Sequence, residues 1–168
     1  MNLTRYLATT LIQLEMAPPL PEPEDPDFNR EKFQQLQKEA VLAELVELLE
    51  ASGNVINKRK LLTDLINRER RASTGLSRGI AIPHVRTSFI RELTIAIARS
   101  REGIAFDSVD GLPSHFFFVV VSPPQVHEDL YLKIYKHLAE VTAFENALTD
   151  LMEVENPGEM IRLLRQWE

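Results

Sequence analysis

The feature that most constrains the fold is an unbroken apolar run of six residues, Phe116–Val121, in the second half of the chain. A strand that faces water on one side alternates apolar and polar residues, whereas a strand covered on both faces is apolar throughout. The run is also far shorter than the roughly 20 residues that a membrane-spanning helix requires. It therefore predicts a central strand with helices on both faces of its sheet, and it argues against a membrane channel.

Segments on either side of this run have the patterns of amphipathic helices. Apolar residues recur three and four apart in Phe33–Ala51, which favours a helix there. Asn57 is a suitable N-cap for a second helix that runs from Lys58 to about Arg70. Apolar stripes at helical spacing return after the central strand, and Asn156 followed by Pro157 indicates the start of a last helix.

Shorter segments have the features of further strands. Leu11–Met16 and Leu93–Ala98 alternate in the period of two that is typical of strands, and Ile80–Ile82 is a brief apolar stretch followed by Pro83. One more apolar segment is Ile104–Val109. Turns are expected on both sides of it, at Glu102-Gly103 and at Asp110-Gly111.

Helices, then strands, then helices around a fully apolar strand predict a three-layer α/β/α sandwich with a central sheet of about five strands flanked by helices. A length of 168 residues suits one well-buried core, so residues 1–168 are interpreted as a single domain. Within it, residues 17–32 are rich in proline and acidic side chains and are expected to form a loop or insertion, because proline breaks both helices and ladders.

Composition excludes several classes of function. The 19 basic and 25 acidic residues give a formal net charge of -6 without a basic stripe, so no nucleic-acid partner is expected. The first residues lack the apolar stretch of a signal peptide, which predicts a cytoplasmic protein without direct membrane insertion. Cysteine is absent and the four histidines lack metal-binding spacing, so neither a metal nor another cofactor is expected.

The strongest candidate for chemistry is His84, which follows Pro83 at the end of a predicted strand. Proline is expected to end the ladder there and to carry the histidine to the surface. An imidazole with a pKa near about 6.5 is largely neutral in the cell, so one ring nitrogen has a lone pair with which to attack phosphorus.

Phosphoryl transfer also needs cations and hydrogen-bond donors close to the nucleophile. The candidates are Arg68, which offers a guanidinium, and Ser73 and Thr74, which offer hydroxyl groups. Each has a plainer alternative: Arg68 as a solvated residue at a helix end, and the two hydroxyls as loop or cap residues.

The hexapeptide Gly79–His84, read with Arg68-Glu69 and with Gly103–Asp107, resembles the IIA domain of the fructose/mannitol class of bacterial phosphotransferase systems, including its nitrogen-regulatory branch. This resemblance implies a mixed sheet, a phosphohistidine at His84, an active-site arginine at Arg68 and a histidine-containing phosphocarrier protein as the donor. The next carrier, a IIB component, or a regulated target protein would be a separate polypeptide. A homodimer is compatible with the resemblance.

The chain departs from the family pattern at one position. Such domains generally carry a second active-site histidine in the helix after the long apolar strand, and here Tyr131 occupies that position, with His127 four residues earlier. Both are candidate phosphate ligands, although a tyrosine donates a hydrogen bond without positive charge. His127 has the alternative of a surface residue at a helix start. Three hypotheses follow: a phosphocarrier, a regulatory protein whose partners sense phosphorylation, and a member that has lost transfer.

Overall fold

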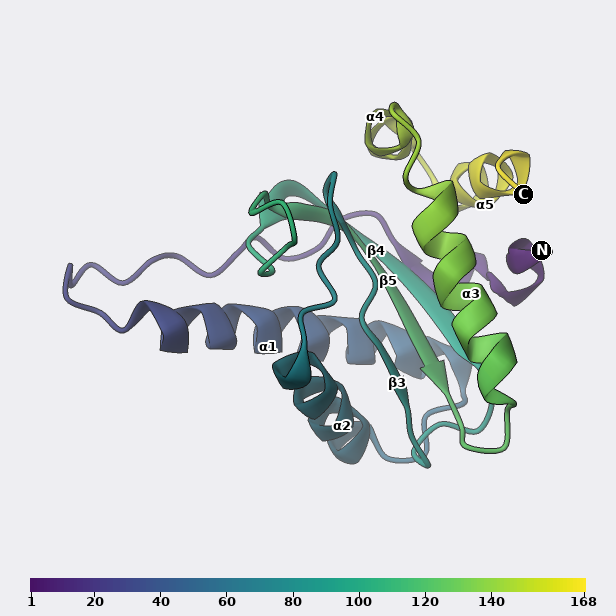
Figure 1. The fold of residues 1–168 in the computed structure, drawn as a ribbon, viewed down its shortest axis with the longest axis horizontal. Helices are drawn as coiled ribbons and strands as arrows, with labels where there is room; N and C mark the ends of the chain where they lie inside the picture. Colours follow the sequence, from purple (N-terminus) through teal and green to yellow (C-terminus); the bar gives the residue numbers. More distant parts are fainter.

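The computed structural model describes residues 1–168 and shows a mixed sheet between two layers of helices (Figure 1). Its strands are β1 (Ile12–Gln13), β2 (Ile80–Ala81), β3 (His84–Arg86), β4 (Thr94–Ile104) and β5 (Ser114–Ser122). The order is β1-β4-β5-β2, and β3 also pairs with β5. The β4–β5 pair is antiparallel and the other pairs are parallel. The predicted sheet of about five strands is confirmed.

Five α-helices flank this sheet. They are α1 (Arg30–Leu49), α2 (Lys58–Arg71), α3 (Glu128–Val141), α4 (Ala147–Glu153) and α5 (Pro157–Gln166), and short 3-10 helices span Leu3–Tyr6, Thr9–Leu11 and Glu50–Ser52. Helices α1 and α2 cover one face of the sheet, while α3 and α5 lie on the other (Figure 1). None of the helices combines the length and the apolar character needed to cross a membrane. The three-layer sandwich expected from the sequence is thus the observed architecture.

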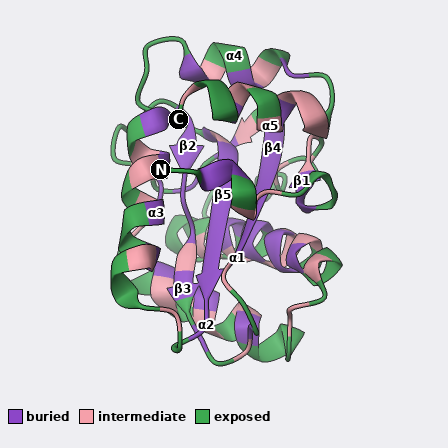
Figure 2. Cartoon of the chain, turned by 90° about the vertical axis from the view of Figure 1, so that its right-hand side faces the viewer, coloured by how far each residue is buried: buried purple, intermediate pink, exposed green.

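Strand β5 lies at the centre of the core, as the apolar run predicts. Every side chain from Phe116 to Val121 is fully buried, and Figure 2 colours most of β5 as buried. Successive strand residues point to opposite faces of the sheet. Phe117 and Val119 therefore pack with α1 and α2, whereas Phe116, Phe118 and Val120 pack with α3 and α5. Burying this run orders the two helical layers around one sheet.

Side-chain caps determine where the helices begin. The side chain of Asn57 accepts a hydrogen bond from the amide of Lys60 at 3.0 Å, and Asn156 caps α5 in the same way. Both predicted starts are confirmed. Helix α1 begins earlier than residue 33, because Asn29 caps it by accepting from the amide of Lys32 at 3.1 Å.

The edge formed by β2 and β3 corrects the prediction that Pro83 ends the ladder. Ile80 pairs with Phe116 and His84 with Val120, so both short strands keep the same register on β5. The carbonyl of Pro83 accepts a hydrogen bond from the amide of Val120 at 2.9 Å. Proline lacks only the donor half of a ladder position. His84 therefore lies on the edge strand itself and not in a loop beyond it.

Two other strand predictions need correction. The expected turn at Glu102-Gly103 is a bulge inside β4, where Gly103 adopts a φ of +82° and a β-carbon would lie 2.8 Å from the ring of His115. The strand expected over Leu11–Met16 is reduced to the two residues of β1, since Leu11 belongs to a 3-10 helix. The turn at Asp110-Gly111 is present as predicted.

The proline-rich segment follows β1 without helix or strand and runs beside α1. The amide of Ala17 donates to the carboxylate of Glu44, and the amide of Leu20 donates to the side chain of Gln37 at 2.8 Å. Together with the first turns of α1, this segment projects from the body of the molecule (Figure 1).

Candidate functional site

His84 is partly buried, and its contacts leave one ring nitrogen without a proton. Its Nδ1 lies 2.7 Å from the carbonyl oxygen of Ile82. A carbonyl only accepts hydrogen bonds, so Nδ1 carries the proton and the lone pair is on Nε2. Nη2 of Arg68 lies 3.2 Å from Nε2 and donates to it. Burial lowers the pKa of His84 below its ordinary value, and the charge of Arg68 acts in the same direction. The ring is therefore neutral at cellular pH.

Arg68 reaches the histidine from the last turn of α2. Its Nη1 donates to the carbonyl oxygen of Ala72 at 3.0 Å. One nitrogen of the guanidinium is thus anchored by the backbone while the other, Nη2, contacts the histidine. A cation in the last turn of a helix is favoured by the helix dipole. The sequence-predicted partners Arg68 and His84 are thus in direct contact.

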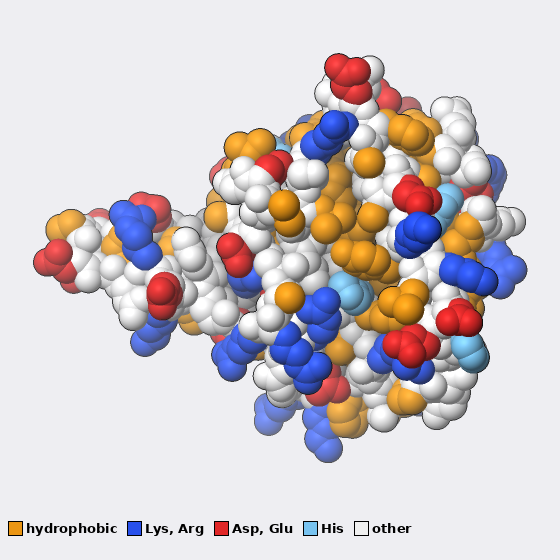
Figure 3. Space-filling model, viewed as in Figure 1, with side chains coloured by type: hydrophobic (Ala, Val, Ile, Leu, Met, Phe, Trp, Pro, Cys, Tyr) orange, Lys and Arg blue, Asp and Glu red, His pale blue; other side chains and the backbone are white.

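A cleft of about 350 Å³ lies next to Arg68 and Tyr131, and His84 is not among its lining residues. Its walls carry three arginines and a tyrosine among seven residues: Asp64, Asn67, Arg68, Arg71, Val85, Arg86 and Tyr131. Basic side chains gather over the region of α2, beside an apolar area in the middle of the same face (Figure 3). Guanidinium groups bind phosphate oxygens in bidentate geometry, so a cleft with these walls suits a tetrahedral anion.

Two tyrosines of α3 enclose the other side of the imidazole. The ring centroid of His84 lies 5.7 Å from that of Tyr131 and 4.6 Å from that of Tyr135. Burial raises the pKa of Tyr131 well above its ordinary range, so its phenol stays protonated and is a hydrogen-bond donor. Sequence reasoning missed Tyr135, although a residue four positions after Tyr131 lies on the same side of a helix.

His127 lies at the start of α3 and not in the wall of this cleft. It is the N-cap residue, its Nδ1 accepts from the amide of Asp129 at 3.2 Å, and its side chain is 79% exposed. This geometry fits the alternative of a surface residue at a helix start. A phosphate-binding role for His127 stays an untested prediction.

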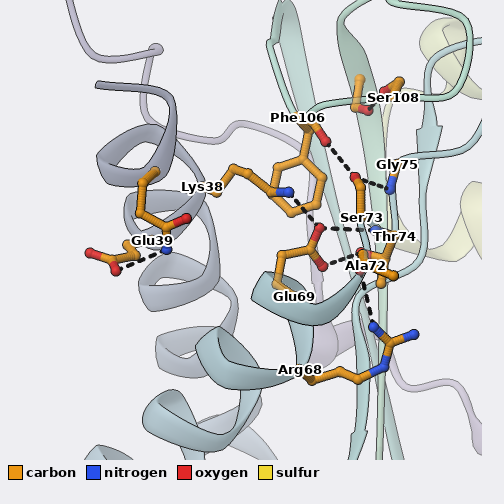
Figure 4. A network of polar contacts seen from close by, with 12 residues as sticks. Lys38, Glu39, Arg68, Glu69, Ala72, Ser73, Thr74, Gly75, Phe106 and Ser108 are labelled. Carbon is orange, nitrogen blue, oxygen red and sulfur yellow. Dashed lines mark hydrogen bonds and ion pairs between the residues drawn. The ribbon is translucent and has the colours of Figure 1, made fainter. Parts of the chain in front are cut away.

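The hydroxyls of Ser73 and Thr74 already donate hydrogen bonds to other groups of the protein (Figure 4). Ser73 donates to the carbonyl of Phe106 at 3.0 Å, and the buried Thr74 donates to the carboxylate of Glu69 at 2.6 Å. The structure therefore brings together His84, Arg68 and Tyr131, while these two hydroxyls stabilise the loop. Their predicted role as phosphate ligands also stays untested.

The chain matches known proteins along most of its length. A family model described as "Phosphoenolpyruvate-dependent sugar phosphotransferase system, EIIA 2" matches residues 29–167. The chain is 35% identical over 119 residues to the fructose-specific EIIA component of Haloferax volcanii, covering 71% of this chain and 77% of the relative. It is 30% identical over 130 residues to the fructose-specific EIIABC component of Bacillus subtilis, covering 77% of this chain but only 20% of that relative.

Solved structures share the fold. The nitrogen regulatory protein IIA-Ntr of Neisseria meningitidis superimposes with a TM-score of 0.80 at 25% identity, covering 98% of this chain and 99% of that one. Enzyme IIAMTL of Escherichia coli, solved in complex with phosphorylated enzyme IIBMTL, gives a TM-score of 0.70 at 16% identity, covering 95% and 97%. The second likeness concerns the fold alone.

Proposed function

The chain belongs to the EIIA 2 family of phosphoenolpyruvate-dependent sugar phosphotransferase systems, and on this premise we propose that Nε2 of His84 accepts a phosphoryl group from the phosphohistidine of a histidine-containing phosphocarrier protein. The observation that carries this proposal is the pair of contacts on one imidazole. The carbonyl of Ile82 holds the proton on Nδ1, and the guanidinium of Arg68 lies next to Nε2, where it would bind the incoming phosphoryl group.

The proposed step is an in-line displacement at phosphorus. The lone pair of Nε2 attacks as the N–P bond of the donor breaks, and the donor imidazole leaves with that electron pair. His84 keeps its proton on Nδ1, so the phosphorylated ring carries positive charge. The carbonyl of Ile82, 2.7 Å from Nδ1, stabilises that charge.

Protein groups around the cleft neutralise charge on the transferring oxygens. Nη2 of Arg68 moves from Nε2 to a phosphoryl oxygen, while Nη1 stays bonded to the carbonyl of Ala72. The protonated phenol of Tyr131 donates a second hydrogen bond. Preorganised donors of this kind are worth about 2.7–4 kcal/mol each in other transfer reactions.

The experiment incubates the chain with the general phosphotransferase enzymes and phosphoenolpyruvate, followed by intact-mass measurement. Wild type is expected to gain one phosphoryl group, and His84→Ala none. His127→Ala is the matched control, because its side chain caps α3 in solvent, and it is expected to be phosphorylated. An unmodified wild type, or a phosphorylated His84→Ala variant, would contradict the proposal.

A separate IIB component is the proposed acceptor of the phosphoryl group. In a family relative of the same fold, a IIA enzyme forms a complex with a phosphorylated IIB enzyme.

A second candidate function is regulatory binding that depends on phosphorylation of His84. It is favoured by the likeness to nitrogen regulatory protein IIA-Ntr over 98% of the chain, and by Tyr131 at the position where the family pattern has a second histidine. Added negative charge would then alter contacts with a target protein. Transfer from the phosphorylated chain to a IIB component supports the carrier, whereas a partner retained by only one phosphorylation state supports the regulator.

A further inference from the structure

A buried ion pair joins the two helices that cover one face of the sheet. Lys38 of α1 places Nζ 2.9 Å from the carboxylate of Glu69 of α2, and their side chains are only 11% and 4% exposed. The ammonium also lies 5.1 Å from the ring centroid of Phe106 (Figure 4). Because isolated charges are expensive to bury, Glu69 and Lys38 each depend on the other.

The same carboxylate holds the loop that follows α2. The amide of Thr74 donates to one oxygen of Glu69 at 2.9 Å, and its hydroxyl donates to the other at 2.6 Å. These bonds fold the chain back onto the helix end and bracket Ala72, whose carbonyl accepts from Nη1 of Arg68. Figure 4 shows the resulting sequence of contacts from α1 to the guanidinium.

We propose that Glu69, anchored by Lys38, is a positioning residue for phosphoryl transfer: it fixes the loop carbonyl that aims Arg68 at His84. This inference rests on the function proposed above. Glu69 precedes the loop and follows Arg68 directly in the sequence, so one carboxylate controls both the helix end and the carbonyl that holds the guanidinium.

Stability alone does not require this arrangement. Apolar residues of similar size often replace a buried ion pair without loss of stability. A more exposed ion pair already bridges the same two helices, with Nη2 of Arg70 2.9 Å from the carboxylate of Glu39. What the buried pair adds is a fixed acceptor for both polar groups of Thr74, next to the residue that contacts the nucleophile.

The first test compares single-turnover phosphorylation by the phosphorylated donor protein in matched variants. Glu69→Leu removes the acceptor for Thr74 and is expected to lower the maximal rate about tenfold or more, with little change in the donor concentration for half-maximal rate, since small misplacements of catalytic groups are costly. Glu69→Gln keeps one acceptor oxygen for the two donors of Thr74 and is expected to recover part of the rate. Glu39→Leu, in the exposed pair, is expected to stay within about twofold of wild type.

A second pair of variants separates positioning from folding. Lys38→Met with Glu69→Leu leaves no unpaired buried charge, so this double variant is expected to fold and still transfer slowly. In an Arg68→Ala background, Glu69→Leu is expected to have no additional effect, because Glu69 acts through Arg68. A folded double variant with the wild-type rate, or an equal effect of Glu69→Leu in both backgrounds, would overturn the inference.

Failure of the function itself gives a different result. If wild type is not phosphorylated, the proposed function is wrong, and positioning is then read from NMR relaxation of the Arg68 side-chain Nε–H. An ordered guanidinium in wild type that becomes mobile in the double variant supports the positioning role. Equal order in both proteins would contradict it.

Discussion

At the scale of single residues, the hydrogen bond from Nδ1 of His84 to the carbonyl of Ile82 determines which nitrogen is available for chemistry. Donor and acceptor are only two positions apart in the sequence, so the segment that leads into β3 selects the tautomer of the histidine. Arg68 donates a hydrogen bond to Nε2, on the other side of the same ring. The candidate nucleophile, its tautomer and the neighbouring cation are thus positioned by contacts within one sheet edge and one helix end.

The pKa of His84 gives a testable consequence of this environment. Burial is the main cause of its lowered pKa, and the charge of Arg68 adds to the effect. Phosphorylation is therefore expected to be independent of pH above about 6.5 and to slow as the pH falls through the lowered pKa, where Nε2 gains a proton. Arg68→Ala is expected to raise the pKa, although burial keeps it below the ordinary value.

NMR titration of the His84 ring in both proteins measures this directly. The folded state binds fewer protons than the unfolded state, so the contribution of His84 to stability is present above about pH 6.5 and is lost as the pH falls through the lowered pKa. A wild-type pKa at or above the ordinary value, or a lower pKa in Arg68→Ala, would show that the site is described incorrectly.

Tyr131 gives a second prediction at this scale. Its phenol is protonated and lies in the wall of the arginine-lined cleft. Tyr131→Phe removes one preorganised donor to a charged phosphoryl oxygen, worth about 2.7–4 kcal/mol, and is expected to slow phosphorylation by about 10²- to 10³-fold. Rapid-quench measurement of phosphoenzyme formation checks this, with the melting temperature as the control for folding. An unchanged rate would exclude Tyr131 as a phosphate ligand.

At the scale of secondary-structure elements, the sequence predicts what depends on local chemistry. The apolar run of β5, the N-cap residues Asn57 and Asn156, and the helical stripes all identify real elements, because periodicity and capping act over a few neighbouring residues. Pro83 and Gly103 mislead for the opposite reason. Local rules predict an end of pairing at each residue, but pairing with β5 resumes after both, in the same register past Pro83 and beyond a bulge at Gly103.

In the candidate site, too, some contacts follow from the sequence and others depend on how the elements pack. His84 and Arg68 are predictable, because a motif places them. The loop hydroxyls are ambiguous in sequence, since a hydroxyl such as that of Thr74 suits a phosphate and equally suits the bond to Glu69 that the structure shows. The contact of Tyr135 with the imidazole depends on how α3 packs against β3, and no short pattern in the sequence encodes that distance.

At the scale of the whole molecule, the site lies where the two helical layers meet the edge strand. Helix α2 supplies Arg68 from one layer, α3 supplies Tyr131 and Tyr135 from the other, and β3 carries His84 between them. His84 is partly exposed on this edge strand, in contact with Arg68 on one side and close to the two tyrosines on the other.

The fully buried Arg99 of β4 connects segments that are far apart in the sequence. Its guanidinium on β4 donates to four backbone carbonyls, those of Leu14, Leu151, Met152 and Val154, and so joins β1 to the end of α4. Arg99→Met leaves these buried acceptors unpaired and is expected to destabilise the protein by about 3–5 kcal/mol. Urea unfolding measures this cost. A loss under about 1 kcal/mol would show that the carbonyls find other partners.

The most direct test of the central claim is to locate the phosphorus atom on the protein. After phosphorylation of nitrogen-labelled chain, coupling between phosphorus and the ring nitrogens in NMR spectra identifies the bonded atom. We expect a single phosphohistidine with phosphorus on Nε2 of His84 and a proton retained on Nδ1, as the bond to Ile82 requires. Phosphorus on Nδ1, on another residue, or on none would contradict the proposed mechanism.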